Sequence, residues 1–115
     1  MDNFCKRLVL SCLDGIILTL VNEQSMHGYN IFYTINLCFD VESSLRFSTI
    51  YSTLAKLEKT QCLTTNWDMT NGRARKMYTI TPKGQTQLET FHQNLQNITE
   101  KIKETKPQQT TNTEV

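Results

Sequence analysis

The sequence contains little of what marks a fibrous, disordered or membrane-spanning chain. Only two of its 115 residues are proline and four are glycine, which excludes a collagen-like repeat and a proline-rich linker. Its most apolar stretch, Leu8 to Val21, is interrupted by Ser11, Asp14 and Gly15 and is too short to span a bilayer. We recognise no secretory signal, so we expect a core helix here and a single-domain, cytoplasmic protein that does not enter a membrane.

The four cysteines form no metal-binding or redox motif. Cys5, Cys12, Cys38 and Cys62 are too widely spaced for a Cys-x-x-Cys pair. We expect reduced thiols that are buried as small apolar side chains. A redox-sensing role stays open, although their spacing does not favour it.

Catalytic motifs are missing as well. The sequence has no paired-carboxylate motif, no glycine-rich phosphate loop and no metal-ligand spacing, and its two histidines, His27 and His92, lie far apart. We therefore expect neither an enzyme nor a bound metal or cofactor, and a structural role for His27.

Positive charge is present but local. The whole chain has a formal net charge of +1, yet residues 46–84 contain seven lysines and arginines and only two acidic residues. A basic region within a nearly neutral chain is typical of one face that contacts nucleic acid.

Apolar spacing predicts two helices before residue 40. The first ends near residues 22–24, and its apolar residues recur at helical intervals: Val9, Leu10, Leu13, Ile16, Ile17, Leu20 and Val21. The second is capped by Ser25, ends before the polar residues 40–44, and carries Tyr29, Ile31, Phe32 and Ile35.

A third predicted helix has two different faces. Ile50, Leu54 and Leu57 lie on one side, and the opposite side carries Ser48, Ser52, Lys56 and Lys59. One face therefore packs in the core, and the other meets solvent or a ligand.

A β-hairpin is predicted next. From Leu63 to Met69 and from Lys76 to Ile80, apolar and polar residues alternate with the period of a strand. Between these runs, Asn71-Gly72 is the pair most favoured where a hairpin turn needs positive φ at both central residues. The hairpin has a basic tip, because two arginines, at 73 and 75, flank a small residue there.

The final predicted helix opens at Thr81-Pro82, a capping residue followed by proline at the first helical position. Its apolar residues are alternately three and four residues apart: Leu88, Phe91, Leu95, Ile98 and Ile102. Such a heptad stripe is typical of contact between two helices. Packing of the stripe onto its own domain is the alternative.

Three helices, a hairpin with a basic tip and a last helix predict a mostly helical α+β fold of the winged helix-turn-helix type. Three phrases are more particular: Met26-His27-Gly28-Tyr29-Asn30-Ile31, Thr49-Ile50-Tyr51 with Leu54, Leu57 and Glu58, and the stretch from Gly72 to Gly84. With them the chain resembles, over about residues 13–90, the PadR family of transcription regulators, in its short form without a separate C-terminal effector domain. That family often has glycine where this chain has Ser48 and Gln61; we expect Ser48 to keep a capping hydroxyl and the helix exit at Gln61 to form without glycine.

The resemblance implies a homodimeric regulator, by default a repressor, that binds double-stranded DNA sequence-specifically. We expect a winged helix-turn-helix domain over residues 1–80, a dimerisation helix over 81–105 and a disordered tail over 106–115. The predicted DNA-binding residues are Arg46, Ser48, Thr49, Tyr51, Ser52, Thr53 and Lys56 around the third helix, and Arg73, Arg75 and Lys76 in the wing. The predicted dimerisation residues are those of the heptad stripe.

Other functions stay open. A winged helix can also act in plasmid or chromosome segregation or in a viral DNA-binding role, and wing arginines can bind an acidic protein instead of DNA. The resemblance further suggests a small aromatic or lipophilic effector between subunits, with Trp67, Phe91, Tyr29 and Phe32 as candidate lining residues.

Overall fold

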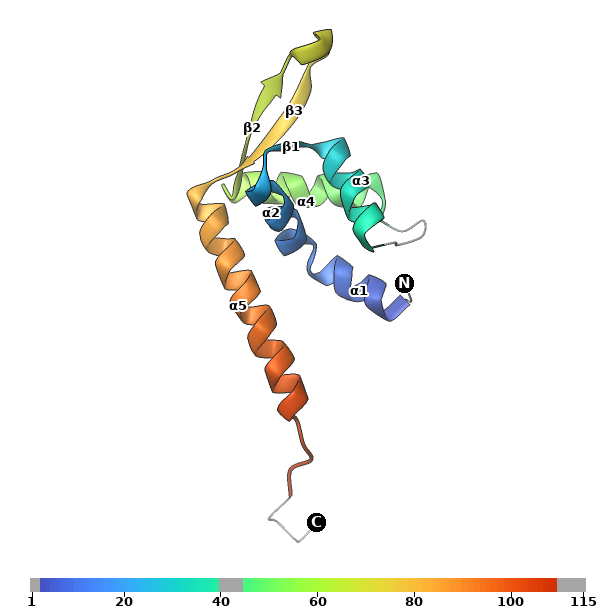
Figure 1. The fold of residues 1–115 in the computed structure, drawn as a ribbon, viewed down its shortest axis with the longest axis vertical. Coiled ribbons are helices and arrows are strands. Elements are labelled where there is room, and N and C mark those ends of the chain that lie inside the picture. The colour runs from blue at the N-terminus through green and yellow to red at the C-terminus, as the bar shows by residue number, and fades with distance from the viewer. Residues whose placement is uncertain (1–2, 40–44, 110–115) are drawn as a thin grey trace.

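The computed structural model describes residues 3–39 and 45–109 (Figure 1). In this part of the chain, the helices α1 (Asn3–Ser11), α2 (Leu13–Glu23), α3 (Gly28–Phe39) and α4 (Phe47–Lys59) come first, with a short strand β1 (Met26–His27) between α2 and α3. The strands β2 (Leu63–Asp68) and β3 (Arg75–Ile80) follow, and then the long helix α5 (Pro82–Glu104). The predicted α+β winged-helix arrangement is therefore confirmed. None of the described helices is long and apolar enough to cross a membrane.

The hydrophobic core lies where α2, α3 and α4 meet the base of the sheet. Its most deeply buried side chains come from all of these elements: Ile17, Ile31, Ile35, Ile50, Leu54 and Leu63. They belong to the apolar runs that the spacing assigned to the interior. Burying one such side chain contributes about 1.5–3 kcal/mol, so this set holds the three helices together.

The first predicted helix is in fact two helices. The chain turns at Cys12, whose φ of −103° and ψ of 12° lie outside the helical range, and α1 and α2 then run in different directions (Figure 1). Ser11 Oγ donates a hydrogen bond to the carbonyl of Arg7 at 3.0 Å, a contact that often bends a helix. The spacing missed the break because Val9 and Leu13, on either side of it, are both buried.

A two-residue strand, β1, was also missed. Met26 pairs with Tyr78 and His27 with Met77, so the sheet has the order β1-β3-β2. Ser25 does not cap a helix as expected; its Oγ lies 2.7 Å from Thr79 Oγ1, because the chain is still extended here and α3 begins only at Gly28. Two residues are too few to show a period.

The strands β2 and β3 form the predicted hairpin, with Leu63 opposite Ile80 and Asp68 opposite Arg75. Both Asn71 (φ 66°) and Gly72 (φ 70°) take the positive φ that their sequence predicted. The connection is wider than a two-residue turn, however, because β2 ends at Asp68 rather than at Met69 and a 3₁₀ turn covers Thr70–Gly72. We call this hairpin the wing.

The exit of α4 forms without glycine, as expected. Gln61 adopts a φ of 66°, the left-handed conformation for which glycine is usually used. The N–H of Gln61 binds the carbonyl of Glu58 at 3.0 Å, and the N–H of Cys62 binds that of Leu57 at 2.8 Å. These bonds close the helix end and direct the chain into β2.

Helix α5 begins as predicted. Thr81 Oγ1 accepts a hydrogen bond from the N–H of Gly84 at 2.9 Å, and Pro82 occupies the first turn. The first part of α5 packs on α2, and the rest extends away from the domain (Figure 1). The polar segment 40–44 and residues 110–115 of the expected tail lie outside the described residues.

Candidate nucleic-acid interface

Helix α4 presents the predicted polar face. Ser48, Ser52 and Lys59 are exposed, opposite the buried apolar face of the helix. Within the described residues the hydroxyls of Ser48 and Ser52 have no hydrogen-bond partner, so both are available to a ligand. The expected capping role of Ser48 is wrong, because Arg46 is the N-cap residue and Ser48 already lies in the first turn.

The two threonines of the predicted set are less accessible. Thr49 and Thr53 are half-buried, because they lie on the flank of α4 between its core face and its exposed face. Thr53 Oγ1 also donates a hydrogen bond to the carbonyl of Thr49 at 3.0 Å, so its hydroxyl proton is already bonded within the helix.

Tyr51 lies at the opposite flank, against the start of α3. Its ring stacks on Phe47 with centroids 5.0 Å apart and an interplanar angle of 7°, and 38% of the residue stays exposed. A Cβ added to Gly28 would lie 2.4 Å from the Tyr51 hydroxyl, so only glycine fits beneath this phenol. Packing therefore fixes the position of Tyr51 beside the polar face.

Both lysines of the predicted set are paired with carboxylates. Lys56 Nζ lies 2.8 Å from Asp14 Oδ2, and this hydrogen bond and charge raise the pKa of Lys56. Lys76 Nζ lies 3.3 Å from Glu58 Oε1, whose other oxygen accepts a hydrogen bond from Thr65. Their charge is largely compensated within the chain, so either lysine would have to exchange partners to bind a phosphate.

The three arginines of the predicted set lack such compensation among the described residues. Arg46, Arg73 and Arg75 are exposed, and none of them pairs with a carboxylate in residues 3–39 or 45–109. Arg46 precedes α4, whereas Arg73 and Arg75 follow the turn at the far end of the wing. Exposed guanidinium groups of this kind bind phosphate oxygens in pairs of parallel hydrogen bonds.

A hydrogen bond holds the far end of β2 against β1. His27 Nε2 donates a hydrogen bond to Asp68 Oδ2 at 2.9 Å, which joins β1 to the end of β2. Hydrogen bonds from the side chain and backbone of Thr70, and then from His27, lower the pKa of Asp68 to about 2, so this carboxylate is ionised at neutral pH. His27 thus has the structural role that was expected.

The comparisons with known proteins agree with this geometry. The model of the transcriptional regulator PadR-like family matches residues 17–90 of this chain. The chain belongs to that family. Membership places it among transcription regulators and not among enzymes, as the sequence predicted.

Several PadR-like and related proteins share the fold. A transcriptional regulator from Clostridium thermocellum superposes with a TM-score of 0.75 and 26% identity, covering 85% of this chain and 96% of that one. PadR of Bacillus subtilis in complex with operator DNA gives a TM-score of 0.61 and 28% identity, covering 69% of this chain and 44% of that one. An uncharacterized protein of Lysinibacillus sphaericus is 32% identical over 77 residues, which are 66% of this chain and 71% of the relative.

Sequence reasoning missed two exposed apolar residues beside this surface and misplaced a third. Phe47 is the first residue of α4, and Met69 follows β2 at the wing. Trp67, considered for an effector cavity, instead lies 64% exposed on β2 opposite Lys76. Phe47 lies three residues before Ile50 and continues the apolar spacing of α4, so that spacing gave no signal of its exposure.

The heptad stripe of α5 is buried at its start and exposed at its end. Leu88 is buried within its own domain, and Phe91 packs so closely on α2 that a Cβ added to Gly15 would lie 2.4 Å from its ring. Leu95, Ile98 and Ile102 are 42%, 56% and 68% exposed, because α5 has by then left the domain. The alternative of packing onto its own domain thus applies to the first two residues, and the last three remain open to a partner.

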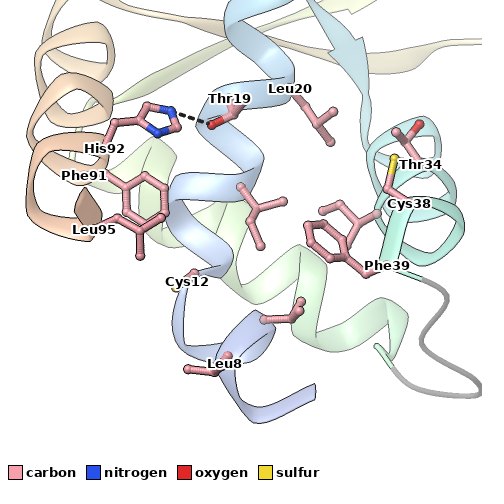
Figure 2. Close-up of a pocket in the computed structure, with 13 residues that line it drawn as sticks. Leu8, Cys12, Thr19, Leu20, Thr34, Cys38, Phe39, Phe91, His92 and Leu95 are labelled. Carbon is pink, nitrogen blue, oxygen red and sulfur yellow. Dashed lines mark hydrogen bonds between the residues drawn. The ribbon is translucent and has the colours of Figure 1, made fainter. Parts of the chain in front are cut away.

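An apolar groove of about 450 Å³ lies between α1, α2, α3 and α5 and ends at Leu95 (Figure 2). Along one edge, His92 Nε2 lies 3.3 Å from Thr19 Oγ1. Two cysteines, Cys12 and Cys38, line the groove, which corrects the expectation that the cysteines are buried: only Cys62 is, and no disulfide joins the four.

The four aromatic residues proposed to line an effector space are separated by the structure. Phe91 lines the groove, whereas Tyr29 and Phe32 contact each other on the other side of α3, beside Phe47, and Trp67 lies on the wing. They come from elements that the fold directs to different faces, so they do not form one site.

Proposed function

We propose that this PadR-like protein binds double-stranded DNA sequence-specifically as a homodimer and represses transcription. The observation that carries the proposal is the distribution of arginines that pair with no carboxylate among the described residues: Arg46 precedes α4, and Arg73 and Arg75 lie at the wing. In a winged helix these two elements meet the major groove and the backbone or minor groove. Such a regulator would act in the cytoplasm, with the chromosome.

The exposed polar face of α4 supports base readout. Ser48 and Ser52 carry accessible hydroxyls that accept or donate hydrogen bonds at base edges. PadR of B. subtilis, which shares the fold, forms a complex with operator DNA. We infer that the same two elements contact DNA here.

Dimerisation is supported by the exposed end of the α5 stripe and the adjoining groove. Leu95 belongs to both, so one apolar surface runs from the groove along α5 to Ile102. A second copy related by a twofold axis would cover this surface with its own α1 and α5 and would place two α4 helices on one face. Repression then follows where the bound site overlaps a promoter.

A small apolar effector is a further part of the proposal. A groove of about 450 Å³ lies within the range of small-molecule sites, and its lining is almost entirely apolar. An apolar compound held there would alter the distance between the two α4 helices of a dimer.

The proposal is tested by titrating the full chain with the duplex upstream of its own gene and with a scrambled duplex, over a range of salt concentrations. The variant Arg73→Ala/Arg75→Ala removes four charges per dimer, so the slope of log K against log salt becomes shallower by up to about 4. The matched control Lys101→Ala/Lys103→Ala removes the same charge from the exposed end of α5 and leaves the slope unchanged.

Each outcome of this titration favours a different function. Preference for the native duplex that persists at physiological salt supports a site-specific regulator. Equal binding to both duplexes favours a scaffold in segregation or a viral role. Absence of binding to either duplex contradicts the proposal and leaves an acidic protein as the partner of the wing.

A further inference from the structure

Four aromatic residues form a cluster between the first turns of α3 and α4. The ring centroids of Phe32 and Phe47 are 4.4 Å apart, those of Phe47 and Tyr51 5.0 Å, and those of Tyr29 and Phe47 5.8 Å. Phe47 is thus the central member and contacts all three others. The cluster lies outside the buried core, since Tyr29, Phe47 and Tyr51 are all exposed by more than a third.

Phe47 has a special place in this cluster because it is the first residue of α4. It directly follows Arg46, the N-cap residue, and directly precedes Ser48, whose hydroxyl is exposed. Despite its three aromatic neighbours, 40% of Phe47 remains exposed to water. An exposed aromatic edge therefore lies between a guanidinium group and a hydroxyl, at the end of the helix that enters the groove.

We infer that Phe47 recognises the methyl group of a thymine in the major groove, an inference that rests on the proposed DNA binding. N-terminal residues of a recognition helix are those that reach base edges. Among the groups that base pairs present in the major groove, the C5-methyl of thymine is the apolar one, and phenylalanine is among the side chains that contact it. A hydroxyl or guanidinium group makes no favourable apolar contact with that methyl group, whereas the edge of an aromatic ring does.

The surroundings of Phe47 hold it ready for this contact. Tyr51 supports one face of its ring, and Tyr51 is itself fixed over Gly28. Phe32 approaches from α3, so two helices fix the ring. Because Phe47 loses little conformational freedom on binding, most of the gain from covering the methyl group is retained as affinity.

The experiment removes the methyl group from the DNA rather than a side chain from the protein. Duplexes that bind the full chain are selected from a random pool, and each thymine of the selected site is replaced in turn by deoxyuridine, which lacks only the methyl group. For the wild-type chain, one thymine in each half-site is expected to be sensitive, with about fourfold weaker binding per replacement, the value of one buried methyl group. Replacement of any other thymine is expected to weaken binding less.

The variants Phe47→Ala and Phe47→Leu assign that thymine to Phe47. Phe47→Ala is expected to bind the thymine and uracil duplexes equally, and Phe47→Leu, which keeps an apolar edge and preserves folding, to show a reduced preference for thymine. The matched control Tyr33→Ala removes another exposed aromatic side chain of α3 that makes no ring contact with Phe47, and it is expected to keep the wild-type preference.

The result that overturns the inference differs from the one that overturns DNA binding. If the wild-type chain binds no selected duplex, the proposed function fails. If it binds but tolerates uracil at every position, or if the Phe47 variants keep the same thymine preference, DNA binding stands and the inference about Phe47 is wrong. Phe47 would then contact a protein or the sugar-phosphate backbone.

Discussion

The proposed dimer makes a quantitative prediction for Ile98, at the centre of the exposed α5 stripe. This residue is 56% exposed in the single chain. Burying a whole isoleucine side chain contributes about 1.5–3 kcal/mol, so covering the exposed part contributes about 1 kcal/mol per subunit. Twofold symmetry doubles this to about 2 kcal/mol, and Ile98→Ala should therefore raise the dimer dissociation constant about thirtyfold.

Sedimentation equilibrium over a range of protein concentrations measures this constant. Alanine has the higher helix propensity, so the substitution does not weaken α5 itself. Asn97→Ala is the matched control, since Asn97 is the neighbouring residue, lies on a different side of α5 and accepts a hydrogen bond from Gln93 of the same helix. A wild-type chain that stays monomeric, an Ile98→Ala constant within threefold of the wild type, or an equal effect of Asn97→Ala would refute the reasoning.

Two further predictions concern the stability of the domain. Replacing Gln61 by glycine relieves its left-handed backbone and should raise the free energy of unfolding by about 0.5–1 kcal/mol in urea titrations, whereas an unchanged value would show that Gln61 is unstrained. Asp68 has its pKa lowered by Thr70 and His27, so its contribution is fully present above the unfolded value near 4 and is lost as the pH falls towards 2. The stability difference between the wild type and Asp68→Asn should therefore shrink over that range, and a constant difference would contradict the assignment.

Local patterns were sufficient for the elements whose period or turn chemistry repeats. The apolar face of α4 appeared in the spacing of three residues, and Asn71-Gly72 fixed the positive φ values of the wing. The start of α5 followed from Thr81-Pro82, since capping depends on residues adjacent in the chain. In each case the interactions that decide the structure are local.

Features that depend on distant partners could not be predicted. The polar face of α4 was predicted from its spacing. Lys56 on that face pairs with Asp14, 42 residues away, and the spacing of α4 gives no information about that partner. The hydrogen bond between His27 and Asp68 likewise requires that β1 pair with β3. The sequence therefore indicated which residues lie on the surface of α4 and the wing, but not which of their cations are already paired with carboxylates.

The attachment of the wing to β1 and α4 also has a consequence for the DNA. β1 joins the start of α3 to the sheet, and Glu58 of α4 binds both Thr65 and Lys76, so polar contacts attach the wing to α4. In DNA bound as proposed, α4 and the wing contact two different base-pair steps. One extra base pair between them moves the step at the wing by about 3.4 Å and rotates it by about a tenth of a turn. Because these contacts hold the wing in place relative to α4, the duplex must bend or untwist. Base pairs that no side chain touches would then set part of the affinity through their stiffness.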